Sequence, residues 1–196
     1  MFRELGKIVD YPLFNDSPKL TLSATLAVSS LQFSDAVRVL CASELMLGCN
    51  VAMRSQFEAF IRSVWVMYCA NEYQVSRLSA ELSQESQQAC KNIPSVNQMM
   101  SDLEEVEHTK NLLVALNEFK SSSWLPLNSF VHSGIHAIHW TKNRVSPQFL
   151  DQIFRISNGL AILAFQHLGI LTGKPGIQSE LIAATACFSS CLPERR

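Results

Sequence analysis

The chain has 196 residues, enough for one domain with a sizeable core. Its 16 basic and 17 acidic residues give a formal net charge of −1. This balance excludes an overall basic surface of the kind that binds duplex nucleic acid, although it leaves room for a small local patch that contacts RNA. Charged residues make up only 17% of the chain, so we expect much of the helical surface to be buried inside the fold or against a partner.

Apolar residues recur at intervals of three and four almost throughout, which predicts an all-α fold. We expect a single domain, an up-and-down bundle of four to five long helices with short extra helices and a core over about 19–173. Ile93-Pro94 fits poorly inside a helix and marks a loop. The elements predicted in the first half are a long helix Lys19–Leu47, a break at Gly48–Asn50, a helix Val51–Cys69, a short helix Glu72–Leu82 and a polar loop Ser83–Gln98.

In the second half, polar caps and prolines mark the helix boundaries. Ser121-Ser122-Ser123 offers N-caps with Pro126 in the following turn, and Ser146-Pro147 has the same pattern. Gly173 is a typical helix end. The elements predicted here are a charged helix over 97–120, a helix Trp124–Trp140, a long helix from Pro147 to Gly173, a short helix within Ile177–Leu192 and a frayed end.

The chain's location is inferred from its cysteines and its first residues. The six cysteines form no CxxC pair and no zinc-binding spacing, so we expect reduced thiols. The opening MFRELGKIVDYPLFND is charged and lacks the apolar core of a signal peptide. Ile156–Gly173 carries no charge over 18 residues, but its polar and glycine residues favour a central bundle helix over a membrane span. We therefore predict a cytoplasmic protein that does not insert into a membrane.

The helix predicted over 51–69 carries a charged row in an otherwise apolar sequence. Arg54, Glu58 and Arg62 recur at intervals of four, with Trp65 near the same side, and Glu58 is placed to pair with either arginine. A helix this apolar must be buried on most of its circumference, and buried charges need partners. Two interpretations stay open: a buried Arg-Glu-Arg ladder that fixes helix register, or a cationic wall that receives an anionic ligand or supports a catalytic group.

A second polar group lies in WLPLNSFVHSGIHAIHW. If this segment is one helix, Asn128, His132, His136 and His139 share a face, with Ser129 beside His132. Histidines at this spacing suit a metal ion or general acid-base chemistry.

The metal alternative has weak support elsewhere in the sequence. Glu105 and His108 form a single ExxH pair, whereas a di-metal bundle needs two such motifs. We therefore predict no metal and no cofactor. In the acid-base alternative, a neutral His132 takes a proton from a ribose hydroxyl while Arg54 or Arg62 stabilises charge on the phosphate.

The order RSQFEAFIRSVWVMYCA, a polar loop, SSSWLPLNSFVHSGIHAI and a long apolar helix resembles the HEPN superfamily (higher eukaryotes and prokaryotes nucleotide-binding). The resemblance spans roughly Val51–Gly173 and rests on short motifs. It implies a four- or five-helix bundle, usually dimeric, related to bacterial toxin, abortive-infection and anti-phage proteins. Many such relatives are metal-independent endoribonucleases.

The HEPN motif places an arginine before a polar residue and a histidine. The resemblance puts the polar residue at Asn128 and the histidine at His132, but Leu127 occupies the arginine position. Arg54 or Arg62, from the neighbouring helix or a dimer mate, would then have to supply the guanidinium. Without it, the chain would be an inactive scaffold or an interaction partner of a protein encoded nearby.

The three resulting hypotheses are a defence endoribonuclease, an RNA- or nucleotide-binding module, and a structural scaffold. The candidate catalytic residues are His132, Asn128, Arg62 and Arg54. The candidate binding residues are Glu58, Trp65, Ser129, His136 and His139. Because the apolar helices exceed what one small bundle can cover, we also predict a homodimer.

Overall fold

A computed structural model describes residues 1–89, 93–143 and 146–194, and it contains no strand within those ranges. The predicted all-α bundle is confirmed. Its helices are α1 (Phe2–Ile8), α2 (Pro18–Ala42), α3 (Met46–Tyr68), α4 (Glu72–Leu78), α5 (Gln84–Ala89), α6 (Val96–Glu104), α7 (Lys110–Val131), α8 (Ile135–Lys142), α9 (Pro147–Thr172) and α10 (Ile177–Ala186), with 3-10 turns at Glu107–Thr109 and Ser189–Cys191.

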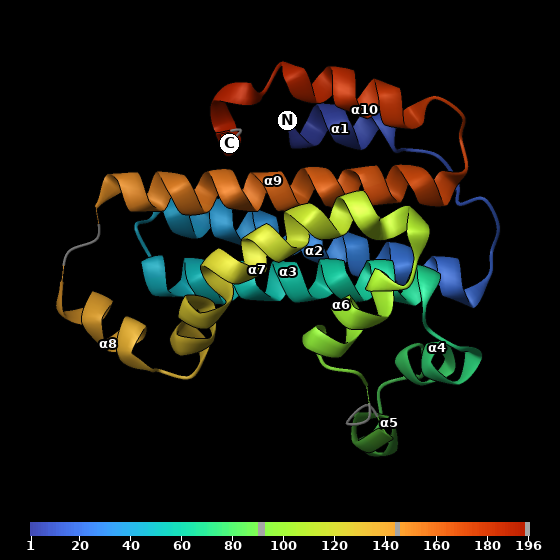
Figure 1. The fold of residues 1–196 in the computed structure, drawn as a ribbon, viewed down its shortest axis with the longest axis horizontal. Helices are drawn as coiled ribbons and strands as arrows, with labels where there is room; N and C mark the ends of the chain where they lie inside the picture. Colours follow the sequence, from blue (N-terminus) through green and yellow to red (C-terminus); the bar gives the residue numbers. More distant parts are fainter. Residues whose placement is uncertain (90–92, 144–145, 195–196) are drawn as a thin grey trace.

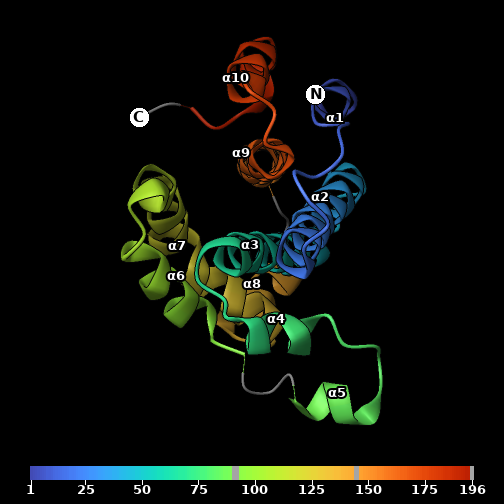
Figure 2. The same cartoon turned by 90° about the vertical axis from the view of Figure 1, so that its right-hand side faces the viewer.

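The central element of the bundle is α3, which contacts α2, α6, α7 and α9. In Figure 2, where α3 and α9 are seen nearly end-on, α2 lies on one side of α3 and α6 and α7 lie on the other. The helices α1 and α10 pack together along the outer side of α9, so the first and the last helix lie on the same side of the molecule (Figure 1). A row of polar residues on α3 can therefore face either α2 on one side or α6 and α7 on the other.

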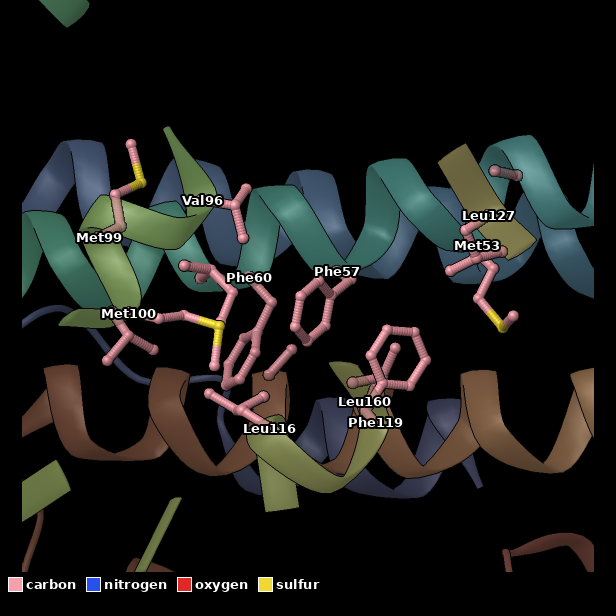
Figure 3. Packing of buried hydrophobic residues seen from close by; sticks show 14 of the residues in the cluster. Met53, Phe57, Phe60, Val96, Met99, Met100, Leu116, Phe119, Leu127 and Leu160 are labelled. Atoms are coloured by element: carbon pink, nitrogen blue, oxygen red, sulfur yellow. The ribbon is translucent and has the colours of Figure 1, made fainter. Parts of the chain in front are cut away.

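The main core is built on the apolar residues of α3. Phe57 and Phe60 are fully buried, and Phe57 lies against Phe119 of α7 with ring centroids 4.4 Å apart. Figure 3 shows these α3 side chains converging with Leu116 of α7 and Leu160 of α9. Burial of large apolar side chains removes their surface from water, so this cluster stabilises the contacts of α3 with α7 and α9.

Local capping sets both ends of α9 as predicted. The Ser146 side chain accepts a hydrogen bond from the backbone N–H of Phe149, and Pro147 occupies the first turn. Gly173 ends the helix with φ of 66°, in the left-handed region that glycine adopts without strain. The signals for this helix are local and agree with its packing, so its ends are readable from the sequence.

The break predicted at Gly48–Asn50 is wrong. The first helix ends at Ala42, and the turn lies at Ser43–Leu45, where Glu44 has a positive φ of 57°. Gly48 lies inside α3, and a Cβ there would sit 3.2 Å from the Leu40 side chain. The glycine therefore allows α2 and α3 to approach closely and does not end a helix.

The helix boundaries predicted between 97 and 140 are also wrong. The charged helix is divided, because α6 ends at Glu104 and α7 begins at Lys110. The Ser121–Ser123 triplet caps nothing: it lies within α7, where the Ser121 and Ser122 hydroxyls donate to the Glu118 carbonyl. Pro126 is inside α7 as well, and the helix ends at Val131.

Two short helices form where no helix was predicted. The helix α5 forms inside the predicted polar loop, of which residues 90–92 lie outside the described residues, as does the predicted free thiol of Cys90. The helix α1 forms in the opening segment and buries Leu5 completely. At the other end, the predicted frayed tail includes residues 195–196, which lie outside the described residues.

By length and composition, α9 is the one described helix apolar enough to cross a membrane. Half of its most apolar 18-residue window is buried inside the fold. A core helix of a bundle has the same properties, as the contacts of α9 with α2 and α3 illustrate.

Candidate functional site

The row Arg54, Glu58 and Arg62 lines a pocket of about 470 Å³, which we call the arginine pocket. Its other walls are Trp124 from α7 and the segment 93–97, which leads into and begins α6. The four-residue spacing places the three charged side chains on successive turns of α3. The pocket thus lies on the side of α3 that faces α6 and α7.

Arg54 is held by three neighbours. Its guanidinium pairs with the Glu58 carboxylate at 2.8 Å, and its Nε donates to Asn128 Oδ1 at 2.9 Å. The guanidinium carbon also lies 5.2 Å from the centre of the Trp124 ring, a cation–π arrangement. Both side chains of the ion pair are mostly buried, so Arg54 is a fixed part of the pocket wall.

Arg62 differs from Arg54 in how its Nε is partnered among the residues that the structure describes. Its Nε is buried, and within the described ranges no group forms a hydrogen bond with it. Glu58, which was placed to pair with either arginine, pairs with Arg54. Leaving a buried donor of a charged group unsatisfied costs on the order of 1–3 kcal/mol. The pocket wall therefore contains a guanidinium with one buried donor that has no acceptor in the described ranges.

The beginning of α6 adds a second source of positive potential to the arginine pocket. Ser95 is the N-cap of α6, with its side chain accepting from the Gln98 N–H, and Ser95, Val96 and Asn97 all line the pocket. The first N–H groups of a helix lack partners within the helix and carry the positive end of its dipole. Two guanidiniums and a helix start thus face one carboxylate, Glu58.

The predicted histidine face does not exist, because α7 ends before it. His132 is the exposed C-cap residue of α7, and its backbone N–H donates to the Asn128 carbonyl at 3.1 Å. The next residue, Ser133, has a positive φ of 53°, and His136 belongs to a separate helix, α8. A left-handed residue changes the direction of the chain, so helical spacing no longer relates His132 to His136 and His139.

Ser129, predicted as a binding residue, connects the two helices instead. Its side-chain oxygen accepts a hydrogen bond from the His136 N–H at 3.0 Å, in the first turn of α8. Its carbonyl accepts from Gly134 at 2.7 Å, and a Cβ at Gly134 would lie 2.6 Å from the Ser129 Oγ. The contacts of this serine explain the α7–α8 turn.

The remaining predicted binding residues lie away from the arginine pocket. Trp65 is 1% exposed, and its Nε1 donates to Asp102 of α6 at 2.8 Å, which makes it a core residue. His139 is exposed and packs edge-on against Trp140. His136 has a buried Nδ1 without a hydrogen bond in the described part of the chain. None of the three histidines lines the pocket.

Trp124 and the segment 93–97 are the pocket residues that the sequence analysis missed. Trp124 was assigned only as a helix start, and Ile93-Pro94 only as a loop. The available signal was composition, since a tryptophan directly after three serines is an unusual aromatic in a polar stretch. Its position over Arg54 depends on the packing of α7 on α3, which no local pattern shows.

A second polar region joins α2, α3 and α9 inside the core, and we call it the polar seam. Ser23 Oγ donates to the Ser63 carbonyl at 2.9 Å, and Ser63 Oγ donates to the Ser23 carbonyl at 2.7 Å. His167 Nε2 lies 2.9 Å from Ser23 Oγ. Burial of the imidazole lowers the pKa of His167 to about 4, so this histidine is neutral in the folded protein at pH 7.

The middle of the polar seam contains a reciprocal pair. Gln56 Nε2 donates to the Ser157 carbonyl at 2.9 Å, and Ser157 Oγ donates to Gln56 Oε1 at 2.7 Å. Ser30 Oγ donates to the Gln56 carbonyl, and Ser34 Oγ lies 3.0 Å from Ser157 Oγ. Small side chains on α2 let the helices approach closely, and each hydroxyl finds a partner across the interface.

Fold and site together define the class of this protein. It is an all-α bundle with a pocket between its central helix, α3, and the two neighbouring helices α6 and α7. The chain belongs to a family of unknown function (DUF6988), whose profile matches residues 27–194. This span includes the described residues of the arginine pocket and most of the polar seam, whereas Ser23 and the first turns of α2 precede it. No curated protein and no solved structure matches the chain. In the part of the chain that the structure describes, no group of three or more His, Cys, Asp and Glu side chains is placed to hold a metal ion.

Proposed function

We propose that the arginine pocket binds a phosphate group of RNA or of a nucleotide, so that the protein acts as an RNA- or nucleotide-binding module. The observation that carries this proposal is Arg62, whose buried Nε has no hydrogen-bond partner in the described ranges. A phosphate oxygen supplies the missing acceptor. A planar guanidinium suits it, because its donors match the oxygens of a phosphate in a bidentate arrangement.

The shape and electrostatics of the pocket support an anion of this size. Its volume of about 470 Å³ lies within the range typical of small-molecule sites. The start of α6 contributes backbone N–H groups, a common environment for bound phosphate. Trp124 contributes an aromatic surface in the same wall, and nucleobases stack on such surfaces in single-stranded RNA complexes.

One observation favours a second candidate, a metal-independent endoribonuclease of a stress or anti-phage defence system, as the HEPN resemblance implies. The hydrogen bond from Arg54 to Asn128 joins a guanidinium to the helical turn that ends at His132. In this candidate His132 takes the proton of a ribose 2′-hydroxyl and Arg54 stabilises charge on the phosphate. The pocket does not include His132, and buried Leu127 stands at the usual arginine position, so we place binding first.

The test is binding of a fluorescently labelled single-stranded RNA oligonucleotide, followed by fluorescence anisotropy, with AMP and inorganic phosphate as competitors. We expect Arg62→Met to weaken binding about tenfold, the loss of one charged hydrogen bond. The matched control is Arg38→Met, because Arg38 is an exposed arginine of α2, paired with Asp35. It should bind as the unaltered protein does.

Each outcome distinguishes the hypotheses. Binding that is equal in both arginine variants, or absent in the unaltered protein, contradicts the proposal and leaves the scaffold alternative. Cleavage of the oligonucleotide that disappears in His132→Ala, with the melting temperature unchanged, would support the ribonuclease candidate. The homodimer, the cytoplasmic location and a protein partner encoded nearby stay predictions; sedimentation at micromolar concentration tests the first.

A further inference from the structure

Two cysteines meet at the turn between α2 and α3. Cys41 lies in the last turn of α2, Cys49 in the first turn of α3, and their sulfur atoms are 3.5 Å apart. Both are free thiols. A disulfide needs a sulfur–sulfur distance of about 2.05 Å. The two sulfur atoms would therefore have to approach each other by about 1.5 Å to form the bond. Seven residues lie between them, and the left-handed turn at Glu44 brings them together.

The two thiols have unequal surroundings. Cys41 is half-buried at the surface end of α2, and its sulfur also lies 3.8 Å from the Leu150 carbonyl of α9. Cys49 is completely buried. An oxidant from solvent therefore reaches Cys41 first, and the buried Cys49 sulfur lies in contact with the Cys41 sulfur.

We propose that Cys41 and Cys49 form a reversible redox pair, in which Cys41 is the attacking thiol and Cys49 the resolving thiol, with hydrogen peroxide or a similar hydroperoxide as the oxidant. The chemical asymmetry agrees with the geometry. The hydrogen bond between the two sulfurs lowers the pKa of Cys41, whereas the same contact and burial raise the pKa of Cys49. A lower pKa increases the fraction of thiolate, the form that attacks an oxidant.

The reaction balances with peroxide alone. The Cys41 thiolate attacks one oxygen of hydrogen peroxide and the O–O bond breaks, which gives a sulfenic acid on Cys41 and hydroxide. Cys49 sulfur then attacks the Cys41 sulfur, and the sulfenic oxygen leaves as water with the proton of the Cys49 thiol. The proton lost from Cys41 converts the hydroxide to a second water. Two thiols are oxidised to one disulfide, and one peroxide is reduced to two waters.

The chain offers a convenient assay, because trypsin cleaves after Arg38 and after Arg54 and releases both cysteines on one peptide, 39–54. The full-length protein is treated with about one equivalent of hydrogen peroxide, alkylated with N-ethylmaleimide and digested. We expect this peptide to lose two hydrogens and carry no maleimide, and dithiothreitol to restore two maleimide sites. Oxidation of the methionines in the same peptide adds oxygen and is not reversed by dithiothreitol, so it is read separately.

Two variants assign the roles. In Cys49→Ala the sulfenic acid on Cys41 has no resolving partner, so we expect dimedone to capture it there, with circular dichroism confirming the fold. The matched control is Cys187→Ala, which removes an exposed cysteine elsewhere and should leave the two-hydrogen loss unchanged. A wild-type peptide that still takes two maleimides after Cys187 has been oxidised would overturn the proposal. Dimedone capture at Cys41 in the wild type without the disulfide would overturn it too.

Discussion

The two polar sides of α3 differ in how their buried groups are partnered. On the side of the polar seam, Gln56 and Ser63 hydrogen-bond to α2 and α9 through both side-chain and backbone groups. On the side of the arginine pocket, Arg54 is paired but Arg62 has a buried Nε with no partner in the described ranges. Both sides contain polar residues that are unusual in a core. Of the side chains named here, only Arg62, on the side of the arginine pocket, has a buried polar atom without a hydrogen-bond partner in the described ranges.

This difference separates a structural role from a binding role. A closed network of hydrogen bonds needs nothing further and specifies how helices pack. A buried charged group without a hydrogen-bond partner lowers the stability of the fold. In native proteins such a group calls for an explanation, and a ligand that binds to it is one. The prediction for mutations is correspondingly asymmetric: changes in the polar seam should cost stability, and changes at Arg62 should cost binding.

The largest effect is expected from Gln56→Ala. The substitution removes a completely buried side chain, and with it the donor to the Ser157 carbonyl and the acceptor of the Ser157 hydroxyl bond. We expect the free energy of unfolding to fall by about 4 kcal/mol, from the cavity and the unsatisfied group together. Urea denaturation followed by circular dichroism measures it. Gln148→Ala on the exposed side of α9 is the control, and a similar loss there would show that the seam is not special.

Acid should weaken the polar seam through His167. The folded pKa is about 4, below the ordinary value of 6.5, so the unfolded chain takes up the proton first as the pH falls. The stabilisation is complete above pH 6.5 and is lost between pH 6.5 and about 4. At about 1.4 kcal/mol per pKa unit, this group removes about 3 kcal/mol between pH 7 and pH 4.

The measurement is urea denaturation across this pH range, compared with His167→Gln. The variant lacks the titrating group, so its free energy of unfolding should depend less on pH by the same amount. Parallel pH profiles for the two proteins would mean that His167 is accessible to protons in the folded state. The polar seam would then be less closed than its hydrogen bonds indicate.

Local signals predicted some elements of the fold and missed others for identifiable reasons. Ser146-Pro147 and Gly173 mark α9 correctly because capping chemistry is local. The turns at Glu44 and Ser133 were missed, since left-handed residues other than glycine have no strong sequence signature. Gly48 was misread as a break because a glycine for close helix packing looks the same in sequence as a glycine that ends a helix.

The candidate site was predicted in the same uneven way. The row Arg54, Glu58 and Arg62 depends only on helical spacing within the part of α3 that was predicted as helix, and the structure places all three in one pocket. The grouping of His132 with His136 assumed an uninterrupted helix, which the turn at Ser133 contradicts. Trp124 needed knowledge of how α7 packs on α3, a contact between residues distant in the sequence.

A smaller effect is expected from Arg54→Met. This change removes the ion pair with Glu58 and the hydrogen bond to Asn128, and it leaves both partners in a mostly buried wall. We expect a loss of about 1.5 kcal/mol in the free energy of unfolding, because these partners keep partial access to water. A double variant with Glu58→Gln should lose less than the sum of the two single changes; additive losses would contradict a direct coupling.

The smallest effect on stability is expected from Arg62→Met. This variant tests most directly whether the arginine pocket has a binding role and the polar seam a structural one. No described group depends on its Nε, so Arg62→Met leaves no partner unsatisfied and removes a buried donor. The free energy of unfolding should stay constant or rise by up to about 1 kcal/mol, while affinity for single-stranded RNA falls about tenfold. Denaturation and anisotropy on the same preparation give both values. A loss of stability as large as that of Arg54→Met would contradict this expectation and show that Arg62 is a structural residue of the bundle.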